Sequence, residues 1–144
     1  HIVGDLGWAD DLTQEVFVRV LSRGATYDPK WPVAVWLFGI ARNLAVDLKR
    51  RERRRREQLI DTSRSPGAPS AAETAEHLEF QDHLEAAIQT LSEEYRSVLL
   101  LRETEGLSYE EIGAALKLSP KTVSSRLHRA RVQLRAQLKP HLPR

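Results

Sequence analysis

The spacing of apolar residues along the chain predicts helices. Between residues 9 and 23, apolar side chains recur every three or four positions, and Gly24 follows as a natural stop. Two X-Pro steps make residues 25 to 32 a loop, since a proline disfavours helical geometry in the residue before it. A long helix is then predicted from about Val33 to about Glu57. No stretch alternates apolar and polar residues long enough to indicate a strand.

The long predicted helix carries two different faces. At 100° per residue, one stripe is apolar and is expected to face a core: Leu37, Ile40, Ala41, Leu44 and Leu48. A second stripe, about a quarter-turn away, consists of Trp36, Asn43, Asp47, Arg50 and Arg54. Amide and guanidinium groups can bond to base edges and phosphates, so this stripe is a candidate DNA surface. The alternative is a solvated face, with Trp36 as an ordinary core aromatic.

Three serines mark helix starts in the second half of the chain. Ser92 begins one helix, and Ser108 with Glu111 three residues later forms a capping box for the next. Ser119 caps the last helix, with Pro120 at its first position, where the missing N–H costs nothing. A short capped helix, a tight turn and a second helix form the helix-turn-helix plan.

The last helix divides into an apolar and a basic side. Residues at steps of three and four are expected to pack inward: Val123, Leu127, Ala130, Leu134 and Leu138. The opposite side, near the helix start, carries the candidates for reading bases: Lys121, Thr122, Ser125, Arg126 and Arg129. Arg131 and Arg135 lie further along and are candidates for phosphate contacts. The alternative is a two-helix corner that binds no nucleic acid, which the cap and the basic side chains disfavour.

A change in composition divides the chain in two. Residues 63 to 75 combine two prolines, a glycine and several small polar residues with no apolar period, which indicates a flexible linker. We therefore expect an all-α fold of two small helical domains, residues 1–60 and 81–144, joined by a flexible linker over 61–80. The C-terminal domain contains the helix-turn-helix.

The charges are segregated along the chain, although the formal net charge of the 144 residues is only +2. Residues 42–57 hold eight basic and three acidic side chains, and residues 120–144 hold seven basic and no acidic ones. Between them, residues 73–94 hold seven acidic and no basic side chains. Two basic blocks indicate two contact points on a polyanion, and two solvated helix faces are the alternative.

Composition gives no support for an enzyme. The chain has no cysteine and five scattered histidines, so we expect no metal and no cofactor. No carboxylate cluster with metal-site spacing, phosphate-cradling glycine loop or nucleophile paired with a base is present, so no catalytic residue is assigned. No apolar run is long enough to span a bilayer and no signal peptide opens the chain, so we expect a cytoplasmic protein without membrane insertion.

Three segments together resemble the sigma-70 family, specifically its extracytoplasmic-function group (group 4). DDLTQEVFVRV (10–20) resembles the family's polymerase-binding helix, and WLFGIARNLAVDLKRR (36–51) resembles its −10-reading helix. The third segment, LSEEYRSVLLLRETEGLSYEEIG with SPKTVSSRLHRARVQLR, resembles its −35-reading domain. The resemblance implies a bacterial promoter-specific initiation factor that recognises −10 and −35 elements.

The resemblance also implies partners and residue roles. The beta-prime clamp helices of core RNA polymerase would meet Asp11, Gln14, Glu15 and Arg19, whose alternative is a plain solvated face. The −10 element would be bound, with a flipped base, by Lys30, Trp31, Asn43, Asp47, Arg50 and Arg51. Arg54 would join Arg131 and Arg135 in contacting phosphates. Further implied partners are the beta flap of the polymerase and an anti-sigma factor.

The chain departs from the family pattern at three positions and at its start. The family usually has glycine where Lys117 stands, often glycine at Lys121 and commonly lysine at Ser124. Because of these differences, the identity of the −35 sequence that the chain would recognise is left open. The family also begins with a further helix before residue 1. The main rival interpretation is a stand-alone helix-turn-helix regulator, which leaves residues 10–20 and the two-faced long helix unexplained.

Overall fold

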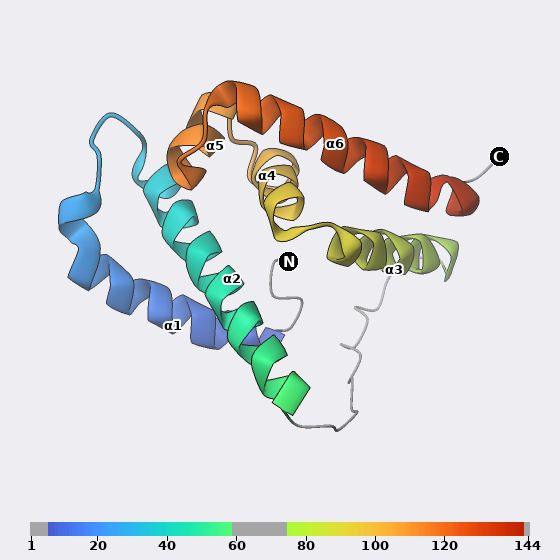
Figure 1. Ribbon diagram of the computed structural model, residues 1–144, viewed down its shortest axis with the longest axis horizontal. Helices are drawn as coiled ribbons and strands as arrows, with labels where there is room; N and C mark the ends of the chain where they lie inside the picture. The colour runs from blue at the N-terminus through green and yellow to red at the C-terminus, as the bar shows by residue number, and fades with distance from the viewer. Residues whose placement is uncertain (1–5, 59–74, 143–144) are drawn as a thin grey trace.

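A computed structural model describes residues 6–58 and 75–142, and the described residues are almost entirely helical. The elements in chain order are α1 (Leu6–Arg23), η1 (Gly24–Thr26), α2 (Val33–Gln58), α3 (Ala75–Thr90), α4 (Glu93–Glu103), α5 (Tyr109–Leu116), α6 (Pro120–Leu138) and η2 (Lys139–His141). In Figure 1, α1 and α2 pair on one side, and α3 runs beside α6 on the other. The predicted all-α class is confirmed. None of the described helices is long and apolar enough to cross a membrane.

The predicted serine caps are present at three helix starts. The hydroxyls of Ser92, Ser108 and Ser119 each accept a hydrogen bond from the backbone N–H three residues on, at 3.3, 3.1 and 3.2 Å. Such a cap satisfies one of the unpaired N–H groups of a first turn and contributes about 1 kcal/mol. The starts of α4, α5 and α6 therefore follow from local sequence.

The main core lies in the C-terminal half. Its fully buried members are Val35, Leu91, Val98, Leu99, Leu101, Leu107, Ile112, Val123, Leu127 and Ala130. The predicted inward face of α6 is confirmed, since four of its five residues are buried and Leu134 packs against the cluster half-buried. One member, Val35, comes from α2, so the N-terminal half contributes to this core.

The predicted core stripe of α2 is only partly right. Of its residues only Leu44 is fully buried, while other buried positions are Val35, Gly39, Ala45 and Val46. The reason is that α2 packs against α1 on one side and against α5 and α4 on another (Figure 1). A helix between two neighbours buries more than one stripe, and the sequence gives no sign of the second neighbour.

The predicted linker extends too far toward the C-terminus. Helix α3 begins at Ala75, so residues 75–80 are helical rather than linker. Leu78 and Phe80 are half-buried in its first turns. Burial of apolar side chains favours a folded helix over a solvated chain. The rest of the predicted linker, residues 61–74, lies outside the described residues.

Candidate nucleic-acid interface

A backbone hydrogen bond closes the turn between α5 and α6. The N–H of Leu118 donates to the carbonyl of Gly113 at 2.8 Å, and Lys117 adopts the left-handed conformation at φ 57°. A Cβ built on Gly113 would lie 2.5 Å from the carbonyl oxygen of Leu118. This close approach fixes the direction in which α6 leaves α5.

Replacing Lys117 with glycine is expected to raise the free energy of unfolding by about 0.5–1 kcal/mol. Lysine is strained at positive φ because its Cβ crowds the backbone, whereas glycine adopts this conformation readily; the entropy that glycine loses on folding offsets part of the gain. Urea denaturation measures the difference. Lys117→Val should instead be destabilising, and a glycine variant less stable than the wild type would contradict the argument.

The outward face of α6 presents polar side chains at helical spacing. Lys121, Ser125 and Arg129 are exposed and lie four residues apart on one face. His128 and Ser124 are exposed beside them, and His128 was not among the predicted residues although its spacing from Lys121 and Ser125 places it on this side. Thr122 is held at the cap, with its hydroxyl 2.9 Å from that of Ser119.

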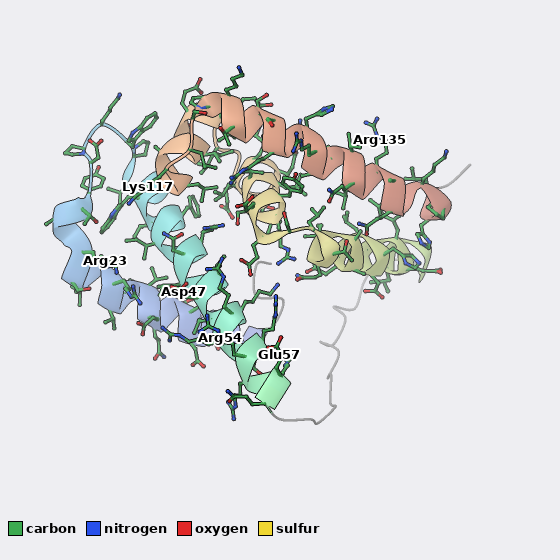
Figure 2. All side chains as sticks on the ribbon, in the orientation of Figure 1. Arg23, Asp47, Arg54, Glu57, Lys117 and Arg135 are labelled. Atoms are coloured by element: carbon green, nitrogen blue, oxygen red, sulfur yellow. The ribbon has the colours of Figure 1, made fainter. Side chains whose placement is uncertain are left out.

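Two of the predicted basic residues of α6 are bound by carboxylates of α4. A guanidinium nitrogen of Arg126 lies 3.5 Å from Glu94, and Arg131 donates to Glu103. The hydrogen bond to Glu103 raises the pKa of Arg131, so this residue stays charged. Arg135 is exposed on the outer side of α6 (Figure 2).

A cavity of about 300 Å³ between α1 and α2 gathers part of the predicted −10 surface. Asn43, Asp47 and Arg50 line it from α2, and Arg19 and Arg23 line it from α1. Arg19 was assigned from the sequence to polymerase binding, yet its side chain is half-buried here. The structure therefore brings Arg19 next to the predicted −10 residues.

The loop before α2 holds Trp31 in place. The hydroxyl of Tyr27 donates to the Trp31 carbonyl at 3.1 Å, and the Lys30 ammonium lies 5.6 Å from the centre of the indole ring. Lys30 is exposed, whereas Trp31 is half-buried and packs against the C-terminal core. Trp36 donates to the Thr26 hydroxyl at 3.1 Å and is tilted against Tyr27, which fits its interpretation as a structural aromatic.

The predicted −10 and phosphate-binding residues are spread along the whole of α2. Arg51 and Arg54 are exposed near its C-terminal end, where Figure 2 labels Arg54. With a rise of about 1.5 Å per residue, Arg54 lies about 30 Å from Trp31. These side chains therefore cannot contact the same base, and together they form an extended surface.

Helix α1 exposes both polar and apolar side chains. Asp11, Gln14 and Glu15 are exposed, and Glu15 lies 3.7 Å from the Arg19 guanidinium. Phe17 and Leu21 are 66% and 87% exposed, and such large exposed fractions are unusual for apolar residues that lie on one helix. Within the described residues, no group of three His, Asp or Glu side chains is arranged to hold a metal ion.

The chain matches two family models in the order that the sequence motifs predict. Residues 1–55 match "Sigma-70 region 2" and residues 81–134 match "Sigma-70, region 4". A relative from Rhodopseudomonas palustris, the ECF RNA polymerase sigma factor EcfG, is 36% identical over 94% of this chain and 74% of its own length. The chain belongs to the extracytoplasmic-function (ECF) sigma factors.

Other ECF relatives agree with this membership. The ECF sigma factor SigE of Mycolicibacterium smegmatis is 41% identical over 92% of this chain, which spans about half of that relative (52%). A solved structure of the sigma factor RpoE with the anti-sigma factor NepR, from Bartonella quintana, has a TM-score of 0.73 at 24% identity. The structural match covers 96% of this chain and 85% of RpoE, so it shows the fold.

A second solved structure, CnrH in complex with the cytosolic domain of CnrY, has a TM-score of 0.68 at 28% identity. It covers 96% of this ECF chain and 76% of CnrH. The sequence prediction of the family is therefore confirmed by both the matched regions and the relatives.

Proposed function

We propose that this ECF protein is a promoter-specific initiation factor that binds core RNA polymerase and recognises the −10 and −35 promoter elements. Membership in the family implies transcription initiation with RNA polymerase. The observation that carries the finer proposal is the exposed polar face of α6, with Lys121, Ser125 and Arg129 four residues apart after a rigid turn. Such a face suits the major groove.

We assign the residues to two DNA surfaces and one protein surface. The −35 surface comprises Lys121, Thr122, Ser125, Arg126 and Arg129, to which we add His128 as a neighbour on α6. The −10 surface comprises Lys30, Trp31, Asn43, Asp47, Arg50 and Arg51. Arg54, Arg131 and Arg135 contact phosphates. The polymerase clamp is bound by the exposed residues of α1, namely Asp11, Gln14 and Glu15, with Arg19 between this face and the −10 surface.

The proposed partners follow from these surfaces and from the relatives. Core RNA polymerase provides the beta-prime clamp helices and the beta flap, and an anti-sigma factor is proposed because the solved structures of RpoE and CnrH hold NepR and CnrY. The protein would act in the bacterial cytoplasm and carry out no covalent chemistry. Its role is to tether the polymerase to two DNA sites. Binding at one site raises the effective concentration of the protein at the other.

Run-off transcription with purified core polymerase tests the proposal. Transcripts should start at a defined subset of a promoter library only when the protein is added. If no promoter-specific transcript depends on it, the proposal is wrong. Tight binding to duplex DNA without polymerase, and no effect on the polymerase, would instead favour a stand-alone helix-turn-helix regulator.

Replacing Arg129 with alanine is expected to weaken binding to the cognate −35 duplex about tenfold, the range of a base-reading arginine. Binding to random duplex should change much less. Arg135→Ala is the matched control, because a phosphate contact contributes equally on both sequences. Fluorescence anisotropy at one fixed salt concentration measures both. An equal loss on both duplexes for Arg129→Ala would remove it from the base-reading set.

A further inference from the structure

Helix α4 ends on a carboxylate, although the C-terminal end of a helix favours basic side chains. Glu103 is its last residue, at an end where the unpaired carbonyl groups carry partial negative charge. Backbone hydrogen bonds close this end, since the N–H groups of Thr104 and Glu105 both donate to the Leu100 carbonyl, at 2.9 and 3.3 Å. The backbone therefore fixes Glu103 where the local charge disfavours it, and its stabilising partner lies on another helix.

The partner of Glu103 is Arg131 of α6. A guanidinium nitrogen of Arg131 donates a hydrogen bond to the Glu103 carboxylate, and the two side chains are 46% and 54% exposed. This hydrogen bond, and to a smaller extent one with the side chain of Tyr109 at the start of α5, raises the pKa of Arg131 above its ordinary value. Side chains from α4, α5 and α6 therefore meet at one guanidinium that stays half exposed.

A second arginine holds Tyr109 beside this pair. The Arg102 guanidinium lies 5.3 Å from the centre of the Tyr109 ring and donates to the Leu107 carbonyl at 2.9 Å. Leu107 is 7% exposed and belongs to the C-terminal core. The groups that surround Arg131 are therefore connected to the packed core, and their positions do not depend on Arg131 alone.

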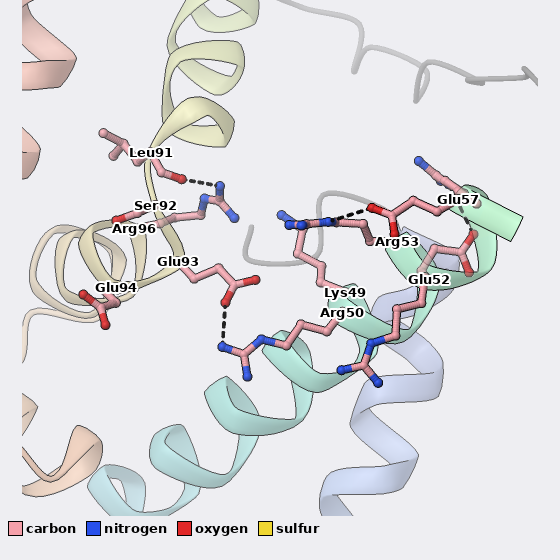
Figure 3. A pocket seen from close by; sticks show the side chains of 12 residues that line it. Lys49, Arg50, Glu52, Arg53, Glu57, Leu91, Ser92, Glu93, Glu94 and Arg96 are labelled. Carbon is pink, nitrogen blue, oxygen red and sulfur yellow. Dashed lines mark hydrogen bonds and ion pairs between the residues drawn. The ribbon is translucent and has the colours of Figure 1, made fainter.

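Two other arginines of the proposed DNA surfaces face carboxylates of α4 across longer distances. Arg50 lies 3.3 Å from Glu93, a pair that Figure 3 shows at a groove of about 1120 Å³ between α2 and α4. Arg126 lies 3.5 Å from Glu94. Both contacts are longer than the hydrogen bond from Arg131. The fold therefore fixes the direction of the Arg131 side chain more closely than the directions of the other two.

Arg131 lies beside the outward face of α6. At about 100° per residue it is about 60° from His128 and about 40° from Arg135, both of which are exposed on this side. A guanidinium carries five N–H donors in a planar fork, and a phosphate binds such a fork through two parallel hydrogen bonds. The contacts to α4 and α5 use part of this set and fix the plane of the fork. The other donors belong to a half-exposed side chain that DNA can reach.

We propose that Glu103 is a positioning residue for DNA binding: it holds the Arg131 guanidinium in the orientation that binds a backbone phosphate beside the −35 element. The inference rests on the proposed promoter-binding function. A free arginine side chain loses rotamer freedom when it binds a phosphate, whereas one held by a carboxylate has lost this freedom on folding. The same carboxylate brings a negative charge near the DNA and weakens the attraction. The gain in orientation is the larger of the two effects.

Glu103→Ala and Glu103→Gln separate orientation from charge. Both variants remove the negative charge, but only glutamine keeps an acceptor oxygen for Arg131. Fluorescence anisotropy should show that Glu103→Ala binds −35 and random duplex about fivefold more weakly than the wild type, and that Glu103→Gln recovers most of this loss. The control is Glu105→Ala, an exposed acidic residue whose removal should leave binding unchanged or tighten it. If both Glu103 variants bind at least as tightly as the control, the proposal is wrong.

The salt dependence of binding connects this loss to a phosphate. Each lost phosphate contact lowers the slope of log affinity against log salt by about 0.9, so Arg131→Ala and Glu103→Ala should both lower it. The double variant should bind no more weakly than Arg131→Ala, because Glu103 acts through that side chain. An unchanged slope in Glu103→Ala, or additive losses in the double variant, would overturn the proposal. A wild type that gives these results but supports no promoter-specific transcript would overturn the proposed function alone.

Discussion

Replacing Arg96 with alanine is expected to lower the free energy of unfolding by about 3 kcal/mol, the cost of leaving buried polar groups without their charged partner. The side chain is 5% exposed although arginine is usually a surface residue. Its guanidinium donates to the carbonyl oxygens of Ile88 at 3.1 Å and of Gln89 and Leu91 at 2.7 Å. Burial lowers its pKa, which marks the loss of water around it.

These carbonyls explain the size of the effect. They lie at and just after the C-terminal end of α3, where helix carbonyls lack a partner within the helix and carry partial negative charge. Alanine removes the guanidinium donor from the carbonyls of Gln89 and Leu91, whereas the carbonyl of Ile88 still accepts the Leu91 N–H at 3.2 Å. Arg96→Lys should lose less, because one ammonium reaches fewer of the carbonyls.

Urea denaturation measures the loss, with Arg55→Ala as the control. Arg55 is an exposed residue of α2, and its removal should change stability by less than about 0.5 kcal/mol. An Arg96→Ala variant within about 1 kcal/mol of the wild type would contradict the role assigned to the guanidinium. In the same variant, α3 should exchange its amide hydrogens faster, since its end is no longer tied to α4.

Replacing Gly113 with alanine is expected to cost about 2–3 kcal/mol of stability and to remove the preference for the −35 duplex over random duplex. Two effects oppose each other here. Alanine favours a helix interior over glycine by about 1 kcal/mol, but its Cβ would lie 2.5 Å from the Leu118 carbonyl oxygen. The clashing atom belongs to the backbone of the turn, so the clash is relieved only by moving α6 away from α5.

The two readouts for Gly113→Ala separate packing from DNA binding. Urea denaturation gives the stability loss, and anisotropy under conditions where the variant is folded gives the affinities for the −35 and random duplexes. Gly24→Ala is the control, because it meets open space. A folded variant that prefers the −35 duplex as the wild type does would show that the turn tolerates the shift and that α6 is not held by it.

The sequence predicted best those features that depend on neighbouring residues. The helix starts after Ser92, Ser108 and Ser119 depend on a side chain three residues from its partner N–H, so the pattern alone is sufficient. The buried face of α6 was also correct, because its apolar residues repeat at helical spacing and it packs on one side.

The sequence predicted least well the features set by distant partners. The buried face of α2 was partly wrong because α5, about 75 residues further along, covers Val35 and Gly39. The burial of Arg96 could not be predicted, because the residue type alone does not distinguish a buried arginine from an exposed one. Arg131 stays a proposed phosphate contact, and no local pattern indicates its hydrogen bond to Glu103.

For this protein the sequence alone determined the helices, their caps, the helix-turn-helix and the family, because these follow from spacing and from motifs within short segments. Only the tertiary structure decided that α2 lies between α1 and α5, that Glu93 and Glu94 hold Arg50 and Arg126, and that Arg96 ties α3 to α4. The physical reason is that such contacts depend on shape and charge meeting in space, which no local period encodes.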